Sequence, residues 1–261
     1  MLEIMWDSKS AMRAQQEKLD TISNNIANAN TNGYKKLNTN FKDLVHETLD
    51  RKGYPVNAAS KTVLQNGTGV RVGEWKRDNT QGSLTQTGLS TDLAIDGTGY
   101  FEVTQPDNTK AYTRSGNFLT DASGTIVDEM GNRLSIVDTG GNNINKVNGP
   151  YKFTANNFQV DENGNVAIKG SNAIIGKIKI STVVGDNSMI SIGDSLFQPK
   201  SGITVSDSKD YSINQGYLEG SNVDISTEMT DMLMTQRAFQ LSSSTLKTAD
   251  EMWQMANNLQ K

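Results

Sequence analysis

The chain has 261 residues, 25 of them basic and 29 acidic, which gives a net charge of −4 at pH 7. Because no basic run concentrates positive charge, the composition argues against binding to nucleic acid or to an anionic membrane. The absence of cysteine excludes disulfides and thiolate metal sites, and no segment approaches the roughly 20 apolar residues that span a bilayer. The first residues, Met1 to Asp7, have neither a basic region nor an apolar core, so we expect no cleaved signal peptide.

The first predicted element is a helix from about Glu3 to Ala29. Apolar residues recur in it at steps of seven, with one more at the alternate seam position: Met5, Met12, Leu19, Ile26 and Ile22. Sustained steps of seven place apolar side chains on one narrow stripe, which is typical of a coiled-coil seam. We therefore predict that this helix pairs with another helix.

The helix is predicted to end in an asparagine-rich segment, Asn24 to Lys35, whose glycine suits a left-handed C-cap. Asparagine is a poor helix former, because its side chain competes for backbone hydrogen bonds. Two interpretations stay open: an extended helix cap, or a set of amides that fixes a neighbouring subunit or the C-terminal helix. The second would use Asn25, Asn28, Asn30, Gly33 and Tyr34.

A connector is predicted next, over residues 36–75. Phe41, Leu44, Val45 and Leu49 indicate a weak helical patch, and Arg51 to Gly69 is polar and irregular. His46, the only histidine, has no nearby nucleophile or orienting acid, so we interpret it as a surface residue.

From about Val70 to Ser212 the apolar period changes to two, in short runs separated by Gly, Asn and Asp. The runs include Leu93–Ile95, Tyr100–Val103 and Ile174–Ile180. Three Asp-x-x-Gly sequences, beginning at Asp121, Asp128 and Asp161, have the residues of tight turns. This punctuation predicts an all-β domain, a sandwich or a barrel-like module, over residues 76–221.

A second long helix is predicted from Asp224 to Leu259, capped by Ser221 or Asn222. Apolar residues again recur at steps of seven: Ile225, Met232, Phe239, Leu246 and Trp253, with Met229, Ala249 and Ala256 beside them. The predicted fold is therefore α+β. Long N- and C-terminal helices pair as a coiled coil, formed by residues 1–35 and 222–261, with the all-β domain inserted between them.

Catalytic and cofactor motifs are not evident. Asp96–Tyr100 begins like a dinucleotide loop, but a strand follows where a helix is required, so a bend between strands is favoured. Asp161–Asn165 resembles a calcium loop, but Asn172 stands where a bidentate Glu is needed. We expect no enzyme activity, no cofactor, no metal and no small-molecule substrate.

Four segments, in this order along the chain, carry recognisable motifs: Asn24–Lys35, Ser90–Phe101, Ala111–Gly124, and Gly216–Asp224 with Glu228, Met229 and Gln236–Gln240. They resemble the signatures of the flagellar axial proteins, the family of rod and hook subunits of the bacterial flagellum. The chain length and the run from Gly67 to Leu84 most resemble the distal rod subunit, with the proximal rod subunit as the close alternative.

The resemblance implies a structural subunit of the basal-body rod. In this family the terminal helices form an inner coiled-coil domain around a channel, the β domain lies outside it, and the segment after the first helix bridges subunits. Copies self-assemble into a hollow helical shaft that transmits torque and conducts exported subunits. The implied partners are the chain itself, other rod subunits, the hook protein and the flagellar export apparatus. The implied location is outside the cytoplasmic membrane.

The assembly interface is expected on the two helices and the asparagine-rich segment. Besides the residues of the first helix and of Asn25 to Tyr34 named above, it includes Ile225, Met229, Met232, Gln236, Arg237, Phe239, Leu246 and Trp253. A function of another class stays open: a carbohydrate-binding β-sandwich tethered by a coiled coil, as in an adhesin. Tyr54, Trp75 and Tyr151 are the aromatic residues that would serve it.

Overall fold

The computed structural model describes residues 2–44, 47–48, 65–138, 140–146, 149–170, 173–183, 185, 188–208 and 210–259. The chain forms two compact units. One, here called the helical unit, comprises Met1–Ala27, Leu37–Lys76 and Asp224–Lys261; the other, the β-rich unit, comprises Asn28–Lys36 and Arg77–Val223. The predicted α+β fold is confirmed at the level of an N-terminal helix, a C-terminal helix and a β-rich middle.

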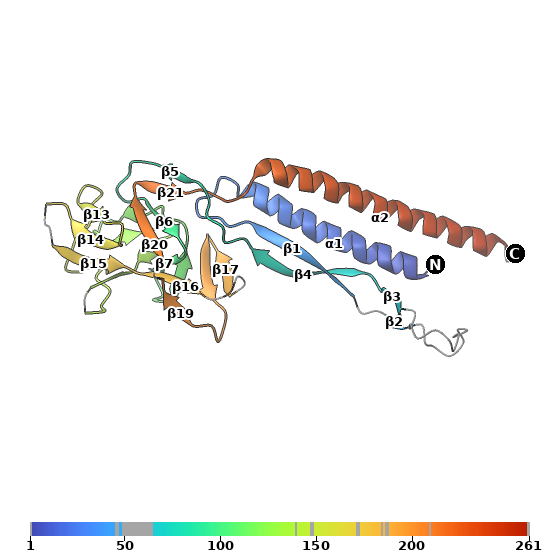
Figure 1. The fold of residues 1–261 in the computed structure, drawn as a ribbon, viewed down its shortest axis with the longest axis horizontal. Helices are drawn as coiled ribbons and strands as arrows, with labels where there is room; N and C mark the ends of the chain where they lie inside the picture. The colour runs from blue at the N-terminus through green and yellow to red at the C-terminus, as the bar shows by residue number, and fades with distance from the viewer. Residues whose placement is uncertain are drawn as a thin grey trace. The chain divides into compact units, whose positions relative to one another are not determined.

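The helical unit contains helix α1 (Leu2–Ala27) and helix α2 (Ile225–Leu259), which lie side by side (Figure 1). Both begin and end within two residues of the predicted limits. Neither α1 nor α2, over its described residues, is long and apolar enough to cross a membrane.

The N-terminus of α2 is capped by Asp224, and the prediction of Ser221 or Asn222 as the cap was wrong. Asp224 Oδ1 accepts a hydrogen bond of 2.9 Å from the Ser226 amide, and its Oδ2 accepts one of 2.9 Å from Thr227 Oγ1. A carboxylate here satisfies amides that the first turn leaves free and interacts favourably with the helix dipole. Asn222 instead binds backbone groups inside the β-rich unit.

Two strand pairs complete the helical unit: β1 (Leu37–Asp43) with β4 (Val70–Arg77), and β2 (Glu47–Thr48) with β3 (Gln65–Asn66). The predicted helical patch around Phe41 was therefore wrong. The polar residues before Phe41 have low helix propensity, and β4 supplies the hydrogen bonds that an extended chain needs. Val45, His46, Leu49 and residues 50–64, with Tyr54, lie outside the described residues.

The β-rich unit is built of short strands, and every registered pair in it is antiparallel. Its largest sheet follows the order β17 (Met189–Gly193), β18 (Leu196–Pro199), β8 (Lys110–Thr113), β7 (Tyr100–Thr104), β11 (Arg133–Leu134), β10 (Ile126–Val127) and β9 (Leu119–Thr120), and β16 (Ile180–Val183) joins β7 to β19 (Val205–Asp207). The second sheet has the order β12 (Ile136–Val137), β15 (Ile174–Ile178), β14 (Asn165–Ile168) and β13 (Phe158–Val160). Two further pairs are β20 (Tyr211–Gln215) with β6 (Leu93–Gly97), and β21 (Tyr217–Glu219) with β5 (Leu84–Gln86).

The predicted strands and turns of this unit are largely confirmed. The glycines of the three Asp-x-x-Gly turns have φ values of 79°, 81° and 80°, and each glycine amide donates to the carbonyl oxygen of the turn's aspartate. The segment from Asp96 to Tyr100 contains the bend between β6 and β7, since β6 ends at Gly97 and β7 begins at Tyr100. The apolar run Ile174–Ile180, however, divides between β15 and β16, which belong to different sheets. Aromatic and branched side chains such as Phe101 and Phe118, in edge-to-face contact, fill the core between the sheets.

The cap of α2 gives a direct test. Asp224→Ala is expected to destabilise α2 by about 0.5–2 kcal/mol, because it leaves first-turn amides without an acceptor. Asp224→Asn is the matched control, since asparagine caps equally well but carries no charge. Circular dichroism during thermal unfolding measures both variants. Equal losses in the two would show that the charge, and not the cap, is responsible.

Candidate assembly site

The predicted seam residues of α1 are all removed from solvent to some degree. Ile22 is buried, and Met5, Met12, Leu19 and Ile26 are half-buried. α1 packs against both α2 and β1, so its covered surface is wider than one stripe. It also includes Ala14 and Thr21, which are buried.

The predicted residues of α2 separate into two groups. Met232, Phe239 and Leu246 are half-buried, whereas the remaining predicted residues are exposed: Ile225, Met229, Gln236, Arg237 and Trp253. A second covered row consists of Glu228, Thr235, Ser242 and Ala249, of which sequence reasoning found only Ala249. These residues also recur at steps of seven, but three of them are polar and a search for apolar repeats does not find them.

A buried polar contact joins the two helices. Asn25 Nδ2 donates to Glu228 Oε2 on α2 at 3.0 Å and to the Leu37 carbonyl at 2.9 Å, and Asn25 Oδ1 accepts from the Leu37 amide at 3.0 Å. Asn25 and Glu228 are each 1% exposed. A single buried polar pair in an apolar seam specifies which turns of two helices face each other. Asn25 therefore fixes the alignment of α1, α2 and the start of β1.

The other predicted residues of the asparagine-rich segment lie in the β-rich unit. Asn28 Oδ1 accepts a hydrogen bond from Thr31, while Asn30 is exposed and Tyr34 is half-buried. Gly33 has φ +70° but lies beyond the end of α1, so it is not the helix cap that the sequence suggested. A Cβ on Gly33 would lie 2.4 Å from the Ser115 amide nitrogen. The glycine is required by this close approach.

A buried ion-pair cluster centres on Glu219, at the end of β21. Its Oε1 lies 2.7 Å from Lys35 Nζ and its Oε2 lies 2.5 Å from Arg114 Nε. None of the three residues is more than 4% exposed. The Gly82 amide donates to Oε1 at 3.0 Å, so both carboxylate oxygens are bound. The cluster therefore joins segments that are remote in sequence.

The remaining donors of the cluster also have partners. Arg114 donates to the carbonyl oxygens of Ile95, Gly97 and Gly99, which form the β6–β7 bend. Lys35 Nζ donates to the Thr80 carbonyl at 2.7 Å. Burial lowers the pKa of Lys35 from its ordinary value, and the hydrogen bond and charge of Glu219 oppose that effect.

Asn222 adds a neutral link beside the cluster. Its Oδ1 accepts from the Lys36 amide at 2.7 Å, and its Nδ2 donates to the carbonyl oxygens of Asp78 and Thr80 at 3.0 and 3.1 Å. These bonds hold together the segment that follows α1 in sequence and the segment that precedes α2. Three of the four chain connections between the units, next to Lys36, Asp78 and Asn222, therefore share one anchor in the β-rich unit.

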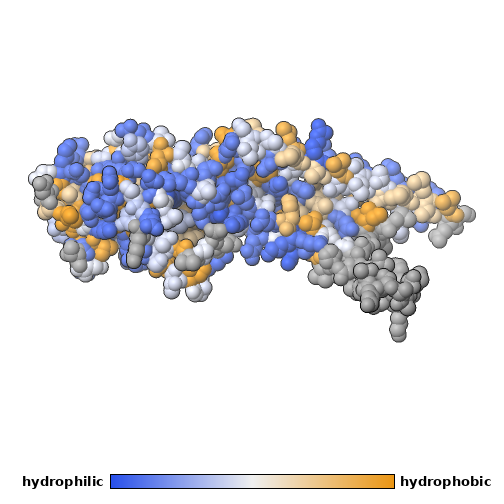
Figure 2. Space-filling model, in the orientation of Figure 1, coloured by the Kyte–Doolittle hydropathy of each residue, from blue (hydrophilic) through white to orange (hydrophobic). Residues whose placement is uncertain are grey.

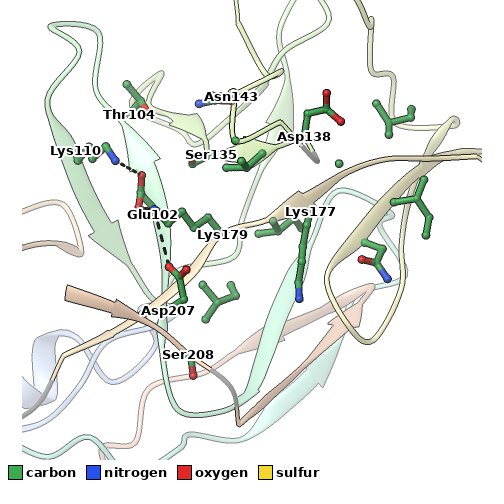
Figure 3. A pocket seen from close by; sticks show the side chains of 18 of the residues that line it. Glu102, Thr104, Lys110, Ser135, Asp138, Asn143, Lys177, Lys179, Asp207 and Ser208 are labelled. Atoms are coloured by element: carbon green, nitrogen blue, oxygen red, sulfur yellow. Dashed lines mark ion pairs between the residues drawn. The ribbon is translucent and has the colours of Figure 1, made fainter.

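The β-rich unit also has a pocket of ≈ 780 Å³ beside β7 and β15 (Figure 3). At its edge Glu102 lies 2.9 Å from Lys110 Nζ and 3.4 Å from Lys179 Nζ, and Lys179 also lies 4.0 Å from Asp207. The hydrogen bond to Glu102 raises the pKa of Lys110. The side chains pair with one another, as in a structural ion-pair network. Among the described residues, no three His, Cys, Asp or Glu side chains are grouped to hold a metal.

Comparison with known proteins identifies the family. Three family models match the chain: "Flagella basal body rod protein" over residues 8–35, "Flagellar hook protein FlgE/F/G D1 domain" over 94–168, and "Flagellar basal body rod FlgEFG protein C-terminal" over 214–259. A Borreliella burgdorferi protein named flagellar basal-body rod protein FlgG is 35% identical over 274 residues, covering 100% of both chains. The chain belongs to the flagellar basal-body rod protein family. Proteins of the same name from Bacillus subtilis and Agrobacterium fabrum are 34% and 36% identical, over 100% and 93% of this chain and 100% and 94% of theirs.

The three family segments meet at the Glu219 cluster of this rod protein. Lys35 lies in the first matched segment, Arg114 in the second and Glu219 in the third. The segments that carry the resemblance are therefore in direct contact with one another in the structure. Residues of the matched segments hold the subunit itself together, in addition to any contacts that they make with neighbouring subunits.

Glu219→Gln tests the cluster. The variant is expected to lower the free energy of unfolding of the β-rich unit by about 3–5 kcal/mol, because two buried cations lose their anion. A urea titration followed by circular dichroism measures the change. Glu162→Gln is the control, since that carboxylate is exposed and should leave the midpoint unchanged. Equal midpoints for the two variants would contradict the account of the cluster.

Proposed function

We propose that this chain is a structural subunit of the distal rod of the bacterial flagellar basal body, assembled from copies of itself. The observation that carries the proposal is similarity along the full length to relatives named FlgG, the distal rod protein. The paired terminal helices support it. On this proposal the protein has no catalytic role, and its working surfaces are those that contact other subunits.

The helices would act as a coiled coil. Two rows of α2 with steps of seven residues are covered, one beginning at Met232 and the other at Glu228, and α1 contributes Leu19 and Ile22. A coiled coil of this kind presents a stiff, elongated element for lateral packing. A heterologous contact that does not close on itself then generates a helical filament. Such a filament, if hollow, transmits torque and conducts exported subunits.

The domain roles follow the same proposal. Helices α1 and α2 form the inner coiled-coil domain predicted over residues 1–35 and 222–261, although residues 28–35 and 222–223 belong to the β-rich unit. Residues 36–75 form the bridging connector and residues 76–221 form the outer domain. The assembly lies outside the cytoplasmic membrane and receives this chain through the flagellar export apparatus. Its further partners are the other rod subunits and the hook protein.

Removal of the gene from its source bacterium tests the proposal. The cells are expected to stop swimming, and basal bodies isolated from them are expected to lack the distal rod in electron micrographs. Expression of the unaltered chain should restore both. Full-length rods in the deleted strain would contradict the proposal.

The role of the apolar seam in assembly can be tested in the same strain with Phe239→Asp. The substitution places a carboxylate among partly buried apolar groups, where an unpaired charge is costly, so the variant is expected not to restore swimming. Ser244→Asp, at an exposed position of the same helix that lies outside the seam, is the control and should restore it. Normal swimming with Phe239→Asp would show that the seam does not need to stay apolar.

A further inference from the structure

Apolar side chains remain on the surface of the helical unit after α1 and α2 have packed together (Figure 2). On α2 they fall mainly on a row that has heptad spacing of its own. The row, here called the trailing flank, consists of Met234, Leu241, Thr245, Thr248, Met252, Met255 and Leu259, all exposed. Leu241 is 68% exposed and Leu259 is 89% exposed. A row that faces solvent is expected to carry charged side chains, and α1 does not cover this row. Neither exposure to solvent nor packing against α1 therefore explains why the row is uncharged.

The trailing flank is the covered seam shifted back by one residue. Leu241 precedes Ser242, Thr245 precedes Leu246, and Thr248 precedes Ala249. One residue turns a helix by about 100°, so the trailing flank lies about a quarter turn around α2 from the side that faces α1. A row with alternating steps of three and four residues is suited to a helix packed alongside.

The opposite flank of α2, one residue forward of the seam, is different. Here called the leading flank, it is apolar at Met229 and Leu233, continues with the amides of Gln236 and Gln240, and becomes charged at Lys247 and Asp250; these residues are all exposed. Two unlike surfaces on either side of one helix are what a head-to-tail contact requires. A closed two-fold dimer would need one surface that matches itself.

The length and polarity of the trailing flank indicate which helix packs against it. The trailing flank extends over 26 residues of α2, or about 39 Å at 1.5 Å per residue, which requires a long helix. In the described part of the chain the long helices are α1 and α2. Between Lys9 and Asn24 every exposed side chain of α1 is polar or charged, so α1 has no matching row there. The leading flank of α2 does begin with apolar residues.

We propose that the trailing flank of α2 packs against the leading flank of α2 in a second copy of this chain. The seam with Phe239 and Leu246 then belongs within the subunit, and the contact between subunits uses residues such as Leu233, Leu241 and Met252. The inference rests on the proposed function, because it assigns the partner and the surface for self-assembly. It changes the interface expected from the sequence, in which Met232, Phe239 and Leu246 contact neighbours.

Charge substitutions distinguish the seam within the subunit from the proposed contact between subunits. Leu241→Asp, in the full chain, is expected to leave the thermal unfolding of the purified protein unchanged, because the side chain is exposed in the subunit. It is expected to abolish swimming when it is the sole copy. Phe239→Asp should lower the unfolding temperature as well. Ser244→Asp, exposed between the two flanks, is the matched control and should leave swimming unchanged.

Cross-linking provides the second measurement, since the chain has no cysteine of its own. Leu233→Cys with Met252→Cys, in isolated basal bodies treated with a bis-maleimide, is expected to give a ladder of covalent multimers. Each single variant should give none. Dimers from a single variant without a ladder from the double variant would indicate a two-fold contact and overturn the proposal.

The outcomes also distinguish this inference from the proposed function. If Leu241→Asp supports normal swimming while Phe239→Asp does not, the trailing flank is not the contact and the rod assignment stands. If cells without the gene swim normally, the rod assignment itself fails.

Discussion

The carboxylate of Glu219 is the point on which the architecture of the β-rich unit depends. It binds Lys35, which follows α1 in sequence, and Arg114, which holds the β6–β7 bend through its other donors. A buried ion pair contributes little net stability compared with apolar packing, but the loss of one partner is costly. Its value is therefore in specificity: only the chain path that brings all three charges together is tolerated.

The helical unit is held together by a different kind of contact. Its internal seam combines apolar residues with a buried Asn25–Glu228 contact, so the alignment of the helices is specified while part of the apolar surface is left for neighbours. A subunit that must join a filament needs both properties. The internal contact has to be unique, and apolar surface has to remain on the outside of the helix pair for the contact between subunits.

Local patterns predicted much of this fold. Steps of seven located both helices, and Asp-x-x-Gly sequences located turns, because each depends on residues close in sequence. The missed features depend on distant partners. Lys35 and Glu219 are 184 positions apart, so no spacing reveals their pairing. Thr235 and Glu228 are polar members of the seam, whose burial depends on Asn25 and other α1 residues. Phe41 lies in a strand because β4 pairs with β1.

The measurement that tests the account most directly is a subunit-resolved cryo-electron microscopy map of basal bodies isolated from the source bacterium. We expect this chain to occupy the distal rod, with α2 of each copy packed along α2 of the next and Leu241 inside that contact. A map in which the chain is absent from the rod, or in which Leu241 faces only solvent, would contradict this expectation.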